Sequence, residues 1–376
     1  MARPAFVSGA ASVSAFGFAW RGLGTALATG QLGFSVSSQL ASSHSSVSAS
    51  EVGEIPASID VGNAKIQKLM SRTARLGAIA VQQALADARW EERREEIGFY
   101  FGVGASGGSM TELTEMLRAS ILDRQFSLAR FGSAGLAACN PLFAFQLMYN
   151  FTLCHGAILN GVGGPNSAFY SRGNGTVAAL FEAMHAIAEG DCERALAGGA
   201  DSAVHAVTWA ELTREGYAKQ GLIPGEGAAL LALSSSEEKA LAIVEHCIFQ
   251  NSIDGLTMDF DAGSIDFVVI APWGEPARRA LRRIVEVNFP HAAMLDISQS
   301  LGESLAATPA LGWVVALDLL HSGKGIHTHV SVAPNTPSPL RGEGNSGVNL
   351  NHHPLPNPSP LKGEGLKTEP PFFGVA

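Results

Sequence analysis

Charged residues are scarce in this sequence. Only 16% of its 376 residues are Asp, Glu, Lys or Arg, against about 25% in an average soluble domain. With 46% hydrophobic residues, such a chain has enough apolar side chains for a large core and for an extensive protein–protein interface. The net charge of −9 argues against the basic surface that a nucleic-acid partner requires.

Long apolar runs and patterned cysteines are absent as well. No stretch of about 18 uninterrupted apolar residues occurs, so the sequence predicts no membrane-spanning helix and no membrane partner. The four cysteines, Cys139, Cys154, Cys192 and Cys247, show neither metal-ligand spacing nor a disulfide framework. The apolar N-terminus, residues 1–20, is interrupted by serines and glycines, unlike a secretory signal. We therefore expect a cytoplasmic protein without a bound metal.

Apolar strands alternate with amphipathic helices along the chain. Ser71–Arg89 has the periodicity of a helix with a buried face, Ile97–Val103 is typical of a buried strand, and Asn140–Ile158 is a long apolar segment with a good helix start at Asn-Pro. This alternation predicts an α/β protein with a mostly parallel sheet. We expect an N-terminal half over residues 1–235 and a C-terminal half over residues 236–333.

The strongest candidate site lies within residues 163–200. Ser167–Tyr170 follows a Gly-Gly-Pro turn and predicts a buried strand, and Thr176–Glu189 has the apolar spacing of a helix. Between them lies a glycine-rich corner, formed by Ser171, Arg172, Gly173, Asn174 and Gly175, where the backbone must approach another group closely. A strand, a sharp corner and a helix together display a nucleophile at a helix N-terminus, where free N–H groups and the dipole favour an anion.

This stretch resembles the β-ketoacyl synthase family of the thiolase superfamily. The matching motifs are Gly164-Pro165-Asn166, Ala197-Gly198-Gly199-Ala200-Asp201 and Gly225-Glu226-Gly227-Ala228. The resemblance implies a thiolase-like fold, in which two related α/β halves form a layered α-β-α-β-α architecture. It also implies that the glycine-rich loop Gly104–Ser109 borders the active site. That loop fits neither the dinucleotide nor the Walker spacing, and no cofactor is expected.

The resemblance also places three reacting positions on residues that lack the family's chemistry. The family uses a cysteine to hold the acyl chain and two histidines to stabilise the charge formed when a malonyl thioester loses carbon dioxide. Counted from the Gly-Pro-Asn turn, Gly173 stands at the cysteine position. Ala271 or Pro272 stands at the first histidine position, Glu303 at the second, and Ser298 where the family has lysine. The resemblance therefore implies that this chain carries no catalytic residue.

Such a chain is similar to the chain-length-factor subunits of the family. These keep the fold, lack the cysteine and pair with an active ketosynthase as a heterodimer, which implies only indirect contact with acyl carrier protein in fatty acid, aryl polyene or polyketide biosynthesis. The family's dimer interface follows the strand after the Gly-Pro-Asn turn, which here comprises Asn166, Ser167, Ala168, Phe169 and Tyr170. The corner residues Ser171, Arg172, Gly173 and Asn174 would border the blocked pocket.

Two other interpretations stay open. The first is a thiolase-fold acyltransferase with a relocated nucleophile such as Ser171, which would need an adjacent base. Cys154 and His155 are a second candidate pair, but neighbours on a helix point about 100° apart, so a structural thiol is favoured. The remaining interpretation is a non-functional remnant.

Two segments are predicted to lack regular structure. Ser35–Glu54 is rich in serine and predicts a surface loop. Residues 334–376 are rich in Pro and Gly, and Pro337–Gly344 recurs almost unchanged as Pro358–Gly365. Two such copies cannot build a stacked core, so we expect a disordered tail. Our hypothesis is that the tail is a translated repetitive DNA element that has replaced the native C-terminus.

Overall fold

The structure is a computed structural model that describes residues 5–40, 46–59, 61–104, 107–247, 265–322 and 328–332. Met1–Asn335 forms one compact unit. The predicted tail over residues 334–376 lies outside the described residues, as do residues 105–106 of the glycine-rich loop. The predicted boundary between the two halves at residue 235 stays a prediction.

A mixed six-stranded sheet forms the N-terminal part, with the strand order β10-β1-β9-β8-β4-β7. Its strands are β1 (Ala5–Val13), β4 (Gly98–Val103), β7 (Asn166–Phe169), β8 (Arg194–Ser202), β9 (Glu226–Ser234) and β10 (Ala242–Val244). β7, β4 and β8 run parallel, whereas β9 pairs antiparallel with β8 and β1, and β1 pairs antiparallel with β10. The sheet therefore ends at β7 on one side.

A second, parallel sheet has the order β12-β11-β13. Its strands are β11 (Phe267–Ala271), β12 (Ala293–Asp296) and β13 (Thr328–Val332). The short strands β2 (Ser35–Val36) and β3 (Ser48–Ala49) form one small ladder, and β5 (Ile121–Leu122) and β6 (Gln125–Phe126) form another.

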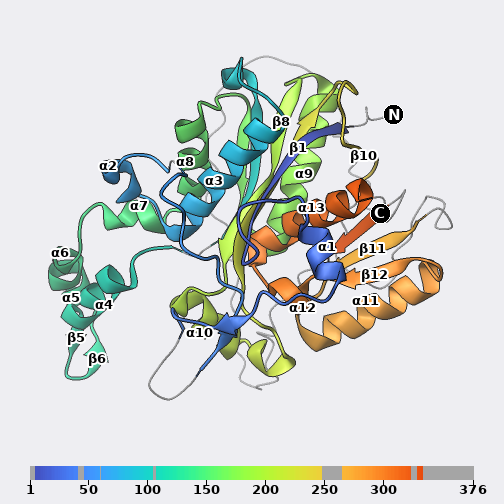
Figure 1. Ribbon diagram of the computed structural model, residues 1–376. Coiled ribbons are helices and arrows are strands. Elements are labelled where there is room, and N and C mark those ends of the chain that lie inside the picture. Colours follow the sequence, from blue (N-terminus) through green and yellow to red (C-terminus); the bar gives the residue numbers. More distant parts are fainter. Residues whose placement is uncertain are drawn as a thin grey trace, which may run out of the picture. The chain divides into compact units, whose positions relative to one another are not determined.

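The helices occupy the connections between these strands (Figure 1). They are α1 (Leu23–Ala28), α2 (Ala64–Gln67), α3 (Arg72–Asp87), α4 (Met110–Ala119), α5 (Leu128–Arg130), α6 (Leu136–Ala138), α7 (Phe143–Leu147), α8 (Phe151–Asn160), α9 (Arg172–Glu189), α10 (Ala206–Arg214), α11 (Gly274–Asn288), α12 (Ser298–Leu301) and α13 (Thr308–His321). A 3₁₀ helix, η5 (Leu305–Ala307), precedes α13.

Successive side chains along each strand pack on opposite faces of the sheet. In β4, Phe99 and Phe101 pack on the α3 face of the large sheet, whereas Tyr100 packs on the α9 face. In β11, Val269 packs toward α9 and α13, and Val268 packs toward α11. Helices therefore cover both sheets, and α9 and α13 lie between them (Figure 1).

The position of α13 between the two sheets explains why its sequence is apolar on every side. Its residues from Thr308 to Leu319 are all buried, as expected of a helix enclosed between two sheets rather than lying on a surface. The resulting order is helix, sheet, helix, sheet, helix, which is the predicted layered α/β architecture.

Three local expectations were wrong. Asn140–Ile158 is not one helix: α7 ends at Leu147, because Met148 adopts extended backbone, and α8 begins at Phe151. The helix expected from Thr176 begins four residues earlier, at Arg172, so most of the glycine-rich corner lies in its first turn. The segment Ser35–Glu54 is not simply a surface loop, because Ser37, Ala49, Ser50 and Val52 are buried.

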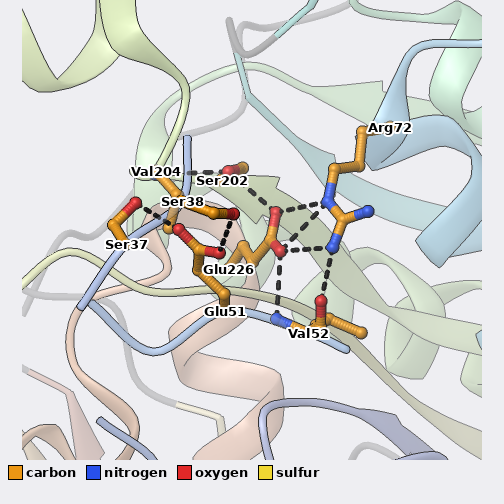
Figure 2. Close-up of polar contacts among 8 residues, drawn as sticks. All are labelled: Ser37, Ser38, Glu51, Val52, Arg72, Ser202, Val204 and Glu226. Atoms are coloured by element: carbon orange, nitrogen blue, oxygen red, sulfur yellow. Dashed lines mark hydrogen bonds and ion pairs between the residues drawn. The ribbon is translucent and has the colours of Figure 1, made fainter. Parts of the chain in front are cut away.

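A buried carboxylate accounts for that last difference. Glu226, the first residue of β9, is 1% exposed, and Arg72 donates to both its oxygens at 2.7–3.0 Å (Figure 2). The backbone N–H of Val52 donates to Glu226 Oε1 at 3.0 Å, and Ser202 Oγ donates to Oε2 at 3.2 Å. Burial acts to lower the pKa of Arg72, but the hydrogen bonds and charge of Glu226 outweigh it and raise that pKa. One carboxylate thus joins α3, β8, β9 and the segment that contains Val52.

We predict that Arg72→Ala lowers the free energy of unfolding by about 3 kcal/mol, because it leaves the Glu226 carboxylate buried without its cation. Urea unfolding monitored by circular dichroism measures the change. Arg75→Ala is the matched control: Arg75 lies one turn along the same helix and donates to the carbonyl of Gln67, not to a carboxylate. An Arg72→Ala variant that is no less stable than the control would contradict the proposed importance of this ion pair.

Candidate functional site

The corner between β7 and α9 forms the centre of the candidate site. Close packing requires glycines on both sides of β7: a Cβ on Gly164, in the turn before the strand, would lie 2.5 Å from the carbonyl oxygen of Ile97, and one on Gly175, in the corner, would lie 2.6 Å from the carbonyl oxygen of Phe169. Ser171 precedes α9 with φ −159° and makes no side-chain capping bond. Arg172 follows with φ +48°, a left-handed conformation that is unusual for a residue with a Cβ.

The two central corner residues face different surroundings. Arg172 Nη2 lies 3.2 Å from Glu215 Oε2, and its Cζ lies 5.2 Å from the ring centroid of Trp273. Gly173 is buried, and a Cβ added to it would lie 3.4 Å from Cγ of Pro309 and 3.8 Å from the carbonyl oxygen of Leu305. Arg172 therefore extends toward the end of β11, whereas Gly173 faces the start of α13.

The end of β11 supplies the second part of the site. Ala271 and Pro272 are buried there, and Trp273, also buried, makes an edge-to-face contact with Tyr217 at a centroid distance of 5.4 Å. Trp273, Tyr217 and Leu305 belong to one small apolar cluster. The residue directly after the expected histidine position, Trp273, is thus enclosed by apolar and aromatic side chains.

Glu303 supplies the third part and is 1% exposed. Its Oε1 accepts hydrogen bonds from the backbone N–H of Leu305 and from Thr308 Oγ1, both at 2.7 Å. Its Oε2 is buried without a hydrogen-bond partner among the described residues. Burial raises the pKa of the Glu303 carboxyl to about 8, although the bonds from Thr308 and Leu305 act to lower it. The group is therefore mainly a neutral acid at pH 7, and a neutral acid can donate a hydrogen bond where a carboxylate cannot.

A cavity of about 350 Å³ opens beside Glu303. Its lining consists of Gly221, Leu222, Ile223, Pro272, Gly274, Arg278, Ser298, Gln299 and Glu303. The Arg278 guanidinium is already engaged, since it donates to Asp296 Oδ2 at 2.8 Å and to Glu275 Oε2 at 2.6 Å. The cavity thus collects Pro272, Ser298 and Glu303, three of the positions singled out from the sequence.

The structure brings most of the predicted site residues together. Arg172 extends toward Trp273, the residue after Pro272, and its charge acts on Glu303. Sequence reasoning missed Glu215 and Trp273, the two contacts of Arg172. The only available signal was the position of Trp273 directly after the expected histidine position. The assignment of Gly173 to the cysteine position stays a prediction, as do the roles given to the other site residues.

Four of the five predicted interface residues form the edge strand β7 (Asn166–Phe169), and the expectation of a buried strand here was wrong, because its residues are exposed or half-buried. Within the described residues the sheet order ends at this strand, and Tyr170, directly after it, is 54% exposed. The Tyr170 ring stacks on Tyr149 with a centroid distance of 4.2 Å. This arrangement leaves one side of β7 available for pairing.

Two other cysteines are poorly suited to act as nucleophiles. Burial raises the pKa of Cys247 to about 12 and also raises that of Cys192, which suppresses the reactive thiolate. His155 and His205 donate to the backbone carbonyls of Phe151 and Gly108 and not to Ser171. Burial lowers the pKa of both histidines.

No described helix has both the length and the apolar character needed to cross a bilayer. The two layered sheets and the corner at a helix N-terminus define an α/β protein of the thiolase-like class. Comparison with known families agrees: the family described as Beta-ketoacyl synthase, N-terminal domain, matches residues 35–239, which is more than half of the chain. This chain belongs to the β-ketoacyl synthase family.

Solved structures of low sequence identity share this fold and support the thiolase-like class. The ishigamide ketosynthase/chain length factor has a TM-score of 0.68 and 20% identity, over 89% of this chain and 93% of that one. The ketosynthase complex AntDE:AntF, described as a type II PKS acyl-carrier protein with its ketosynthase bound to the hexaketide, has a TM-score of 0.64 and 16% identity, over 86% and 93%. A β-ketoacyl synthase from Burkholderia phymatum STM815 has a TM-score of 0.62 and 20% identity, over 85% and 86%. The predicted fold class is confirmed.

We predict that Glu303 makes the protein less stable as pH rises from about 4.5 to about 8. Its folded pKa of about 8 lies above the ordinary value of 4.5, so the folded state binds more protons than the unfolded state in this window, and the free energy of unfolding falls as pH rises. At about 1.4 kcal/mol for each unit of pKa, the loss across the window is on the order of 4 kcal/mol.

Urea unfolding at several pH values measures this loss. Glu303→Gln keeps the shape and remains neutral, so its stability should vary less between pH 5 and pH 8. Glu286→Gln, at an exposed position on α11, should retain the wild-type dependence. If Glu303→Gln shows the same slope as the wild type, Glu303 is not the titrating group.

Proposed function

We propose that this chain is a non-catalytic subunit of the chain-length-factor type, which pairs with an active ketosynthase in fatty acid, aryl polyene or polyketide biosynthesis. The observation that supports this proposal is which residues stand at the three positions where the family has its reacting residues. Gly173, Ala271 or Pro272, and Glu303 supply neither a thiol nor an imidazole, while the corner, the strand ends and the layered fold around them are kept. This combination supports a role in binding and shaping over a role in bond formation.

The remaining side chains at the site support the same conclusion. Arg172 is paired with Glu215 and lies over Trp273, and apolar residues fill the space around Trp273. Glu303 is held by Leu305 and Thr308. Acyl transfer needs a nucleophile with an adjacent base, and we assign neither to this chain. In the proposed complex the ketosynthase partner would carry the acyl chains. Acyl carrier protein would interact with this chain only indirectly, through that partner.

We place the heterodimer interface at β7. Phe99 N–H donates to the carbonyl of Pro165, so by the alternation of a strand Ser167 and Phe169 direct their backbone groups toward β4. Asn166 and Ala168 then direct theirs away from the sheet. An exposed aromatic pair borders this edge: Tyr170, directly after β7, is 54% exposed and stacks on Tyr149, which is 43% exposed. An unpaired backbone edge with apolar neighbours suits a strand of a second subunit.

The ketosynthase structures that share this fold are consistent with such a pairing. One is described as a ketosynthase/chain length factor and another as a ketosynthase in complex with its acyl-carrier protein. At 20% and 16% sequence identity, these structures support the fold of this chain but do not identify a partner. The ketosynthase partner is therefore part of the proposal.

We predict that Ala168→Pro weakens the complex with a co-expressed ketosynthase at least about tenfold. Proline removes the outward N–H of residue 168 and leaves the hydrogen bonds to β4 in place. Size-exclusion chromatography with light scattering measures the loss of the heterodimer, and a thermal melt checks that the chain itself folds. Ala168→Val keeps the N–H and should bind as the wild type does. If Ala168→Pro binds with unchanged affinity, the interface does not use this edge.

A further inference from the structure

Exposed apolar side chains gather in one region of this chain, the segment from Met110 to Tyr149. Exposed fractions between 43% and 74% are found here for Ile121, Leu122, Phe126, Leu128, Leu142 and Met148. More than half of the large apolar side chains that the described residues expose belong to this segment. Isolated apolar side chains on a surface need no explanation, but a gathered group marks an interaction surface.

The segment has almost no core of its own. It comprises α4, the β5–β6 hairpin, α5, the π-helical turn η2 (Phe131–Gly135), α6 and α7, and α4 packs on η2 and α6. Among its residues, all of which the structure describes, Met116 and Phe143 are the buried apolar side chains. Gln146 ties the end of the segment to the rest of the chain, because its Nε2 donates to the carbonyl of Lys68 at 2.8 Å. Internal packing therefore leaves the apolar side chains of the hairpin exposed.

Charge is missing from the later part of this segment and from the strand that follows it. Residues Phe131–Ser171 contain no Asp, Glu, Lys or Arg, although these make up 16% of the whole chain. The turn of the hairpin carries Asp123 and Arg124, whose charges cancel. Protein interfaces are depleted of charge at their centre and enriched in aromatic residues and Met. A partner that covers this surface therefore presents an uncharged, apolar face.

The segment is continuous with the edge strand β7. Tyr149, its last residue, stacks on Tyr170, directly after β7, with a centroid distance of 4.2 Å. These two residues are 43% and 54% exposed, so the apolar surface does not stop at the end of the segment. A protein that adds a strand to β7 therefore meets this surface as well.

We infer that the segment Met110–Tyr149 forms a second part of the heterodimer interface, in which the β5–β6 hairpin packs Phe126 and Leu128 against an apolar face of the ketosynthase subunit. The identity of the partner rests on the proposed function. The presence of an uncharged docking surface does not, because it follows from the exposure and the sequence of the segment.

A charge placed on the hairpin tests this inference. Leu128 is 74% exposed, so Leu128→Asp should cost the isolated chain little, but in the complex it would bury a carboxylate without a partner. We predict that it raises the Kd for a purified ketosynthase at least about tenfold. Val287→Asp is the matched control, because Val287 is 72% exposed on α11, and it should bind as the wild type does. Biolayer interferometry measures the affinities, and thermal melts check that both variants fold.

The outcomes separate this inference from the proposed function. Unchanged affinity of Leu128→Asp, with weaker binding of Ala168→Pro, would restrict the interface to β7 and overturn the inference. A wild-type chain that binds no ketosynthase would contradict the proposed function and, with it, the partner named here. A homodimer of this chain that Leu128→Asp dissociates would show that a second copy covers the surface, and would overturn the assignment to a ketosynthase.

Hydrogen exchange of the wild-type chain supplies a measurement that needs no variant. Peptides over residues 121–131 should exchange at least about fivefold more slowly in the complex than in the free chain, because a covered hairpin opens less often. Peptides from α11 should exchange at the same rate in both samples. Equal rates over residues 121–131 would overturn the inference even if Leu128→Asp did not fold.

Discussion

The buried carboxylate of Glu226 is the constraint on which the site depends. Its ion pair with Arg72 fixes the start of β9 against α3, β8 and the segment at Val52 (Figure 2). The preceding residue, Gly225, donates its N–H to the carbonyl of Glu303 at 2.9 Å, and Glu303 N–H donates to the carbonyl of Ile223 at 2.8 Å. The loop that carries Glu303 is therefore positioned by the same network, although Glu303 lies far away along the chain.

The candidate site places a paired cation and a buried neutral acid within a β-ketoacyl synthase fold. The corner at the start of α9, the end of β11 and the loop at Glu303 lie close together. Under the proposed function, each presents a group poorly suited to thioester chemistry. Arg172 adds a cation at the corner, and the ion pair with Glu215 stabilises it. Glu303 is neutral because burial opposes its charge. A neutral acid and a paired cation add little net charge to the interior, which is consistent with a subunit that shapes a complex.

Local patterns in the sequence were sufficient for much of the fold. α3 (Arg72–Asp87) forms within the predicted helix Ser71–Arg89, and β4 (Gly98–Val103) forms within the predicted buried strand Ile97–Val103. The break after Leu147 was missed because apolar residues continue through it and mask the interruption. The left-handed backbone of Arg172 and the protonation of Glu303 were also inaccessible, since both arise from tertiary packing. The contacts of Arg172 with Glu215 and Trp273 join segments that no local motif connects.

The central claim is that this chain does not itself carry acyl groups. Intact-protein mass spectrometry tests it most directly, after the chain has been incubated with acyl-loaded carrier protein, alone and together with a co-purified ketosynthase. The account predicts that only the ketosynthase gains acyl mass, while this chain keeps its unmodified mass in both samples. If this chain gains acyl mass on its own, it contains a nucleophile, and the assignment as a non-catalytic subunit is wrong.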